Sequence, residues 1–235
     1  MTPGVGGCLP VTCVIPVHNG ARTVRRAIRS ALEQTAGAID VLLVDDGSTD
    51  GSAAIVAEYG GRVRCLGQAR GGPAAARNTG VGAAAGEYVA FLDQDDWWAP
   101  DKIERQLARF AARGGLEVSV GLVESVWEGA KTVRATDQPR AGAVPGYVAG
   151  TMLARRSAFE VVGGFSEHLW FMDSLDWFAR ARDQRIVIEL LPDVLLFHAV
   201  HRGNLSRRGS DSRAEALRVL KASLDRRRLA PDPHP

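Results

Sequence analysis

Cysteine is scarce in this chain and long apolar runs are missing, and both features limit the classes of protein to which it can belong. Its 235 residues include three cysteines, Cys8, Cys13 and Cys65, which form no close-spaced metal-binding pair and cannot all join one another in disulfides. Free thiols in a reducing compartment fit this pattern best. No apolar run reaches the roughly 18 residues that a membrane-spanning helix needs, and the start MTPGVGGCLP lacks the charged and apolar regions of a secretory signal. We therefore expect a cytoplasmic protein with no transmembrane segment.

An excess of charge of either sign is also missing. The 29 basic and 27 acidic residues leave a net charge of +2, which argues against nucleic acid or another polyanion as a partner. Residues 226–228 are three consecutive arginines, but the proline-rich end beside them favours a solvated tail over a binding patch. With 46% hydrophobic and 24% charged residues, the composition is that of a globular protein able to bury a core.

Several nucleotide-binding motifs do not occur. The first strand–helix turn has no GxGxxG, the motif that dinucleotide-dependent oxidoreductases need there. The segment DGSTDGS is rich in small and hydroxyl residues but lacks the GxxxxGK[ST] lysine of a phosphate loop. Sugar-nucleotide pyrophosphorylases carry a glycine-rich loop with Arg and Lys after the first strand, and PVHNGART does not resemble it. These three classes are therefore disfavoured.

Apolar strands alternate with helices through the first hundred residues. The run TCVIPV is rich in β-branched residues and stops at the turn HNG, which is typical of a buried strand. Wholly apolar strands with helices between them predict a parallel sheet covered on both faces. We expect strands at 12–17, 41–44, 62–66 and 88–92, with helices around 24–32, 55–59 and 74–85.

The second half is less regular, and it shows neither an internal repeat nor a clear second domain. A helix follows Pro100, which is a favoured residue in the first helical turn. Residues 128–146 read as a loop punctuated by Gly and Pro. Further strands are expected at 117–126, 147–153 and 186–191, and further helices at 157–162, 173–181 and 214–224.

Polar side chains follow three of the predicted parallel strands. His18-Asn19, Asp45-Asp46 and the segment DQDD at 93–96 should converge on one rim, because ligands bind at the carboxyl ends of strands in such sheets. The like charges at 93 and 95 repel, and a divalent cation such as Mg²⁺ or Mn²⁺ offsets that repulsion while binding substrate phosphates. Asp96 lies near the next helix and has a second reading, as a helix cap.

These segments together resemble the family-2 glycosyltransferases of the GT-A fold. The similarity runs through PVHN, VDDGSTDGS and GGPAAARNTGVGAAAGEYVAFLDQDD, and continues through GTMLARRSAFEVVGGF, SLDWFARARDQ and LFHAVHRGNLS. It implies an α/β, Rossmann-like, mostly parallel sheet with helices on both faces, in a single domain with an acceptor-side subregion. We expect this domain over 11–206, with a nucleotide-sugar half at 11–98 and an acceptor and catalytic half at 99–206. A C-terminal helix and flexible tail follow at 207–235.

The resemblance also implies an activity. Family members transfer a sugar from a nucleotide-diphosphate donor, such as a UDP-sugar, to an acceptor hydroxyl with inversion at the anomeric carbon. The acceptor segments are the least patterned part of the chain, so neither the sugar, the base nor the acceptor follows from the sequence. The Ala-, Arg- and Gly-rich composition indicates a high-GC bacterial source.

The nucleotide-binding residues follow by position within the matching motifs. Pro16 and Asn19 match the first nucleotide-binding turn, and His18 stands where the family usually has Tyr. Asp45 or Asp46 would accept hydrogen bonds from the nucleobase and its ribose. The alternative is that both aspartates only cap a turn.

The resemblance assigns five more residues to the donor and its metal. Arg77 matches the ARN segment and would face the diphosphate, with a surface salt bridge as the alternative. Asp93 resembles the ribose-facing member of the acidic triplet, and Gln94 lies beside it in the nucleotide site. Asp95 resembles the metal ligand for Mg²⁺ or Mn²⁺. His201 matches a histidine that joins the metal in some members, with a surface residue as the alternative.

The catalytic helix departs from the family pattern. Where the usual base lies the chain has Ser174, flanked by Asp173 and followed by Asp176. The two aspartates and Arg180 share one helix face, and we expect Asp173 to be the general base and Asp176 a supporting acid. The alternative is an acid cluster that the helix dipole favours. The Ser174 and His18 departures also support a second class of function, a non-catalytic nucleotide-sugar-binding partner subunit.

Four tryptophans have two readings each. Trp97 and Trp98 follow the acidic triplet and either stack on a sugar or pack internally. Trp170 and Trp177 are expected in the core or in the acceptor wall.

Overall fold

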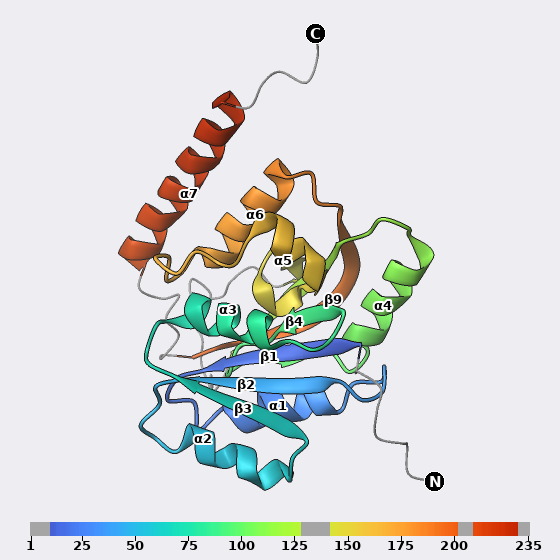
Figure 1. Ribbon diagram of the computed structural model, residues 1–235, viewed down its shortest axis with the longest axis vertical. Helices are drawn as coiled ribbons and strands as arrows, with labels where there is room; N and C mark the ends of the chain where they lie inside the picture. The colour runs from blue at the N-terminus through green and yellow to red at the C-terminus, as the bar shows by residue number, and fades with distance from the viewer. Residues whose placement is uncertain (1–9, 128–141, 202–208, 230–235) are drawn as a thin grey trace.

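A computed structural model describes residues 10–127, 142–201 and 209–229. Nine strands form one sheet in the order β3-β2-β1-β4-β8-β6-β9-β5, with β7 paired to β6, and helices lie on both sides of it (Figure 1). The strands are β1 Val11–Val17, β2 Asp40–Asp46, β3 Val63–Gln68, β4 Tyr88–Phe91, β5 Trp97–Trp98, β6 Val118–Trp127, β7 Val144–Pro145, β8 Leu153–Arg155 and β9 Ile188–Val200. The helices are α1 Val24–Leu32, α2 Ser52–Ile55, α3 Pro73–Ala83, α4 Lys102–Ala112, α5 Arg156–Val162, α6 Asp173–Asp183 and α7 Gly209–Leu229, with 3₁₀ turns at Val56–Tyr59 and Ala149–Thr151.

The predicted parallel sheet is confirmed for the first four strands. β1 pairs in parallel with β2 on one side and β4 on the other, and β2 pairs in parallel with β3. All seven residues of β1 are buried, as a central strand with both faces covered requires. The carboxyl ends of these strands therefore meet at one edge, where the predicted rim lies.

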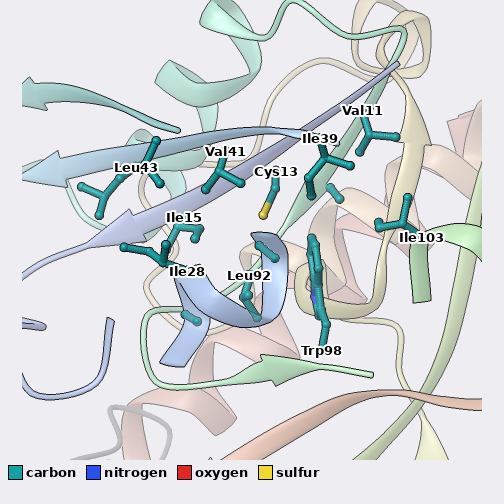
Figure 2. Packing of buried hydrophobic residues seen from close by; sticks show 14 of the residues in the cluster. Val11, Cys13, Ile15, Ile28, Ile39, Val41, Leu43, Leu92, Trp98 and Ile103 are labelled. Carbon is teal, nitrogen blue, oxygen red and sulfur yellow. The ribbon is translucent and has the colours of Figure 1, made fainter. Parts of the chain in front are cut away.

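Alternate residues of β1 point into two separate cores. Cys13 and Ile15 pack with α1 and α4 on one face, where Figure 2 shows them near Ile28 and Trp98. Val14 packs on the other face with side chains of α3, α5 and α6. The period of two along the strand produces this division, and helices on both faces confirm the predicted α/β class.

Past β4 the sheet becomes mixed. β8 pairs antiparallel with β4 and β6, while β6 and β9 are parallel. The predicted strand at 147–153 is wrong, because this stretch makes a 3₁₀ turn at Ala149–Thr151 before the short β8. The Thr151 hydroxyl donates hydrogen bonds to the carbonyl oxygens of Gly146 and Val148, and such local bonds compete with a strand ladder.

The strand predicted at 186–191 extends much further. β9 runs to Val200 beside the long β6, so the segment LFHAV, which lies beyond the predicted strand, is also part of it. The two-residue β5 pairs with Leu196 and Phe197 of β9 and has no signal of its own in the sequence. Of the predicted loop at 128–146, residues 128–141 lie outside the described residues.

The C-terminal helix packs against the rest of the domain. The predicted helix at 214–224 is part of α7, which contacts α6. Arg226 and Arg227 both pair with Asp183 of α6, at 2.8 and 3.1 Å. Arg227 and Arg228 are exposed and Arg226 is partly exposed, as a solvated run requires, although this run belongs to a packed helix. Among the described helices, none is both long and apolar enough to cross a bilayer. Cys13 and Cys65 are free thiols, and Cys8 lies outside the described residues.

Candidate functional site

The turn after β1 is joined to the turns after β2 and β4. The His18 ring nitrogen Nδ1 lies 2.8 Å from the carbonyl oxygen of Asp46. The His18 backbone N–H donates to Gln94 Oε1 at 2.8 Å, and Gln94 Nε2 donates back to the His18 carbonyl at 3.2 Å. Asn19 adopts a left-handed φ of 50°, and its Oδ1 accepts the Thr49 N–H at 2.8 Å. Residues that the sequence placed at three strand ends therefore meet at one rim.

The two aspartates at the end of β2 have different surroundings. Asp46 is 3% exposed. Its Oδ1 accepts from Gln68 Nε2 and the Gly71 N–H at 2.8 and 2.7 Å, and its Oδ2 accepts from the Gly72 N–H at 2.8 Å. Asp45 makes one such bond, from the Ser48 N–H at 3.0 Å. Asp46 thus fixes the loop before α3, while Asp45 keeps acceptor capacity at the rim.

A buried arginine joins the acidic triplet to α6. Arg77 is 5% exposed, and it donates to Asp93 Oδ1 at 2.6 Å and to Asp173 Oδ2 at 2.5 Å. Burial lowers the pKa of Arg77, but the two carboxylates more than offset this and raise it. The guanidinium is therefore permanently charged, and the alternative of a surface salt bridge for Arg77 is wrong. Its expected contact with a diphosphate stays a prediction.

Asp95 lies beside His201. Asp95 Oδ2 is 3.0 Å from His201 Nε2, and both side chains are partly exposed. Within the described residues no cluster of three or more His, Cys, Asp or Glu side chains could enclose a metal. The carboxylate nevertheless suits Mn²⁺ or Mg²⁺ when substrate phosphates supply other ligands, and the imidazole nitrogen favours the softer Mn²⁺ over Mg²⁺. These two residues therefore fit the metal that the resemblance implies.

Asp96 belongs to the fold. It is 2% exposed, its Oδ1 lies 2.9 Å from His198 Nδ1, and the same oxygen accepts the Ala199 N–H at 3.0 Å. Burial raises the pKa of Asp96, and the hydrogen bond with His198 opposes that rise. The reading of Asp96 as a helix cap is wrong, because its partners lie on β9. His198 was not predicted, and its spacing of three from His201 is the only hint in the sequence.

The expected catalytic helix carries both candidate acids at its first turn. Asp173 and Asp176 are 5% and 7% exposed. Asp176 Oδ2 accepts from Ser166 Oγ at 2.5 Å and from Arg180 Nε at 2.8 Å. Ser174, at the usual base position, accepts the Ala149 N–H at 3.2 Å. Both Asp176 and Ser174 are thus tied to neighbouring backbone and side chains.

The tryptophans divide between core and rim. Trp98 and Trp177 are buried and belong to the packing. Trp97 is partly exposed and stacks on Phe197 with ring centroids 5.6 Å apart, so stacking on a sugar stays a prediction for it. Trp170 is 40% exposed, which excludes the core and leaves the acceptor wall as its predicted place.

Sequence comparison identifies the family. A model of the family described as "Glycosyl transferase family 2" matches residues 12–163. Succinoglycan biosynthesis protein ExoO of Rhizobium meliloti is 36% identical over 145 residues, which are 61% of this chain and 41% of the relative. Putative glycosyltransferase EpsH of Bacillus subtilis is 38% identical over 100 residues, which are 41% of this chain and 29% of the relative. The chain thus spans less than half the length of these curated relatives.

Solved structures share the fold at low identity. S. aureus TarS 1-349 in complex with UDP-GlcNAc superposes with a TM-score of 0.75 and 19% identity, over 93% of this chain and 66% of that one. Mannosyltransferase PcManGT from Pyrobaculum calidifontis, in complex with GDP-Man and Mn2+, gives a TM-score of 0.64 and 22% identity, over 93% and 69% of the two chains. The chain therefore belongs to glycosyl transferase family 2 and has the GT-A fold of these glycosyltransferases.

Proposed function

We propose that this protein transfers a sugar from a nucleotide-diphosphate donor to an acceptor hydroxyl, with inversion at the anomeric carbon. Family membership supports a transferase, and two structural neighbours were solved in complex with UDP-GlcNAc and with GDP-Man. The observation that carries the proposal is the buried Arg77, which joins Asp93 of the donor rim to Asp173 of the catalytic helix. The carboxylate proposed for the donor and the proposed base are thereby held by one guanidinium.

The donor end of the site is assigned to the turn after β1 and to Asp45. Asp45 presents a carboxylate with remaining acceptor capacity, which suits the N–H or hydroxyl donors of a base and ribose. His18, Asn19 and Gln94 are bonded to one another or to the neighbouring turn, so they form the floor on which a nucleotide would lie. Pro16 is the second-last residue of β1, just before that floor.

The leaving group is assigned to Asp95 and His201. A divalent cation held by these two residues would stabilise the negative charge that develops on the departing nucleoside diphosphate. Their own contribution is to keep a carboxylate oxygen and an imidazole nitrogen 3.0 Å apart at the rim. Both atoms could then bind the same ion.

The base is assigned to Asp173. An inverting displacement needs a group that accepts the proton of the acceptor hydroxyl. Asp173 bonds to Arg77 through Oδ2, which leaves Oδ1 for that proton. Asp176 has Ser166 and Arg180 as partners, so its proposed role is to hold the helix in place.

The test is donor binding followed by donor hydrolysis. We expect UDP-GlcNAc or GDP-Man to raise the melting temperature in the presence of Mn²⁺, because ligand binding to the folded state stabilises it. Slow release of the nucleoside diphosphate to water would then show catalysis, and Asp173→Asn should abolish it. A protein that binds a donor tightly yet never releases the diphosphate, with any acceptor, would be the non-catalytic partner subunit.

A further inference from the structure

A carboxylate from the C-terminal helix reaches the backbone in front of the catalytic helix. Glu215 of α7 is 8% exposed. Its Oε1 accepts the Trp170 N–H at 3.2 Å, and its Oε2 accepts the N–H groups of Phe171 and Met172 at 2.9 and 3.2 Å. A buried carboxylate is destabilising unless it is hydrogen-bonded. The three backbone N–H groups that converge on Glu215 meet this requirement.

These three N–H groups depend on Glu215. In the described part of the chain, none of them donates to a backbone carbonyl, and α6 begins only at Asp173. N–H groups at a helix start have no partner within the helix, and a negative charge at that end is favoured by the helix dipole. Glu215 therefore satisfies a stretch of backbone that would otherwise depend on water.

The anchored stretch leads directly into Asp173. The Asp173 carboxylate is fixed by Arg77 of α3, while the chain immediately before it is fixed by Glu215 of α7. The proposed base is thus held by two helices, α3, which comes before it in the sequence, and α7, which comes after it. Trp170, whose ring is 40% exposed, belongs to the same anchored stretch.

α7 is docked firmly enough to serve this purpose. Val219 and Ser223 are 3% and 6% exposed, and Arg226 pairs with Asp183 of α6 at 2.8 Å. With Glu215, these residues recur every three or four positions and form the helix face that covers α6. The carboxylate is therefore delivered by a packed helix.

We propose that α7 is part of the transfer site and that Glu215 is a positioning residue for Asp173. The inference rests on the proposed transfer function. Glu215 touches neither donor nor acceptor in this arrangement; it acts by setting the backbone at 170–172. A displacement of about 1 Å at a reacting group can lower a rate 10²-fold, so loss of this anchor should appear in kcat and leave donor affinity nearly unchanged.

The experiment compares three variants of the full chain with the parent. Glu215→Ala removes the acceptor, Glu215→Gln keeps one oxygen at the same reach, and Val219→Ala loosens the same helix face without touching the anchored backbone. Release of nucleoside diphosphate from UDP-GlcNAc or GDP-Man with Mn²⁺ gives kcat and KM. Melting temperature, donor Kd and amide hydrogen exchange at 170–172 are measured on the same samples.

We expect Glu215→Ala to lower kcat 10- to 100-fold, with donor Kd within threefold and amide exchange at 170–172 at least tenfold faster. Glu215→Gln should recover most of the loss. Val219→Ala should lower the melting temperature and leave kcat within threefold. Equal kcat losses for Glu215→Ala and Val219→Ala at equal destabilisation would overturn the proposal, since docking of α7 alone would then explain both.

Hydrogen exchange separates this inference from the proposed function. If the parent releases no diphosphate, the proposed transfer function is wrong. If amide exchange at 170–172 is the same in Glu215→Ala as in the parent, Glu215 does not anchor this backbone, whatever the result for transfer. Faster exchange there, with a normal kcat, would show that the anchor exists and does not position the base, which also overturns the proposal.

Discussion

Two acidic turns at the rim, one after β2 and one after β4, divide their neighbouring carboxylates in the same way. After β2, Asp46 is buried with three donors while Asp45 keeps free acceptor capacity. After β4, Asp96 is buried on β9 while Asp95 lies partly exposed beside His201. In both turns the second aspartate of the pair anchors the loop and the first faces outward.

The difference arises from backbone geometry. Asp45 and Asp46 are the last two residues of β2, and successive side chains on extended backbone point to opposite sides. Asp95 and Asp96 instead lie at the end of a turn that the Asp96 N–H closes on the Asp93 carbonyl, and this turn directs their side chains to different partners. The inward carboxylate must find hydrogen-bond donors, because burying a charge without them is strongly destabilising. Once bonded, it fixes the turn and thereby the direction of its neighbour. A pair of identical residues thus combines a fixed turn with an available ligand.

The largest expected effect tests whether α6 also has one aspartate available for function and one that stabilises the fold. Asp173→Asn should lower the transfer rate by roughly 10²–10⁴, the usual loss for a general base, with donor affinity within about threefold. Asp176→Asn should instead lower the free energy of unfolding by about 1–3 kcal/mol, because Ser166 and Arg180 lose a charged acceptor. Rates and donor affinities are measured for both under matched Mn²⁺. A dead Asp176→Asn enzyme of normal stability would reverse the assignment.

The turn after β4 should separate stability from metal dependence. Asp96→Ala removes the partner of His198 and of the Ala199 N–H, and should lower the free energy of unfolding by about 3–5 kcal/mol. Asp95→Ala should change it by less than about 1 kcal/mol while abolishing the Mn²⁺ dependence of donor binding. Chemical denaturation and donor titration with and without Mn²⁺ check both results. Undiminished metal dependence in Asp95→Ala would remove Asp95 from the site.

The turn after β2 should show the same division with smaller effects. Asp45→Asn should weaken binding of free nucleoside diphosphate by about 1–3 kcal/mol and leave the melting temperature unchanged. Asp46→Asn should lower the free energy of unfolding by a similar amount, since an amide nitrogen would face the Gly71 or Gly72 N–H groups. Calorimetric binding and thermal melting distinguish the two. If Asp45→Asn binds nucleoside diphosphate as tightly as the parent does, Asp45 only stabilises the turn and does not bind the nucleotide.

Lys102 shows how burial without an opposite charge lowers the pKa of a lysine. Lys102 is fully buried, with Gln106 and the Met152 carbonyl as acceptors. Burial lowers its pKa from 10.5 to about 7, and the nearby Cys13 thiol opposes this slightly. Between these values the unfolded chain binds more protons than the folded one, so stability of the parent should rise with pH.

Lys102→Met should remove that dependence. We expect the variant to be more stable than the parent below pH 7. This advantage should fall and then reverse as pH rises toward 10, because a pKa lowered from 10.5 to about 7 changes the relative stability by about 4–5 kcal/mol over that range. Denaturant unfolding at several pH values measures it. Glu104→Gln, an exposed change on the same helix, serves as the control. A pH-independent difference between variant and parent would show that Lys102 is not a buried charge.

Much of the first hundred residues followed from local pattern. The apolar runs of β1 to β4 and the helices between them are short-range features, and parallel pairing of such strands places their polar ends at one edge. The resemblance then carried residue roles onto that edge. Boundaries after β4 were less predictable, since β5 and the length of β9 depend on pairing between segments distant in the chain.

The sequence by itself determined that the polar residues after three strands, two of them in acidic turns, would converge on a rim of an α/β sheet, because the carboxyl ends of parallel strands meet at one edge. Only the tertiary structure decided which carboxylate of each pair is available, because that depends on donors supplied by other elements: the loop before α3 for Asp46, β9 for Asp96, and α3 for Asp173. It also decided that Glu215, an unremarkable helix residue in the sequence, lies in front of α6. A side chain's direction and its long-range partners are set by packing, which no local pattern records.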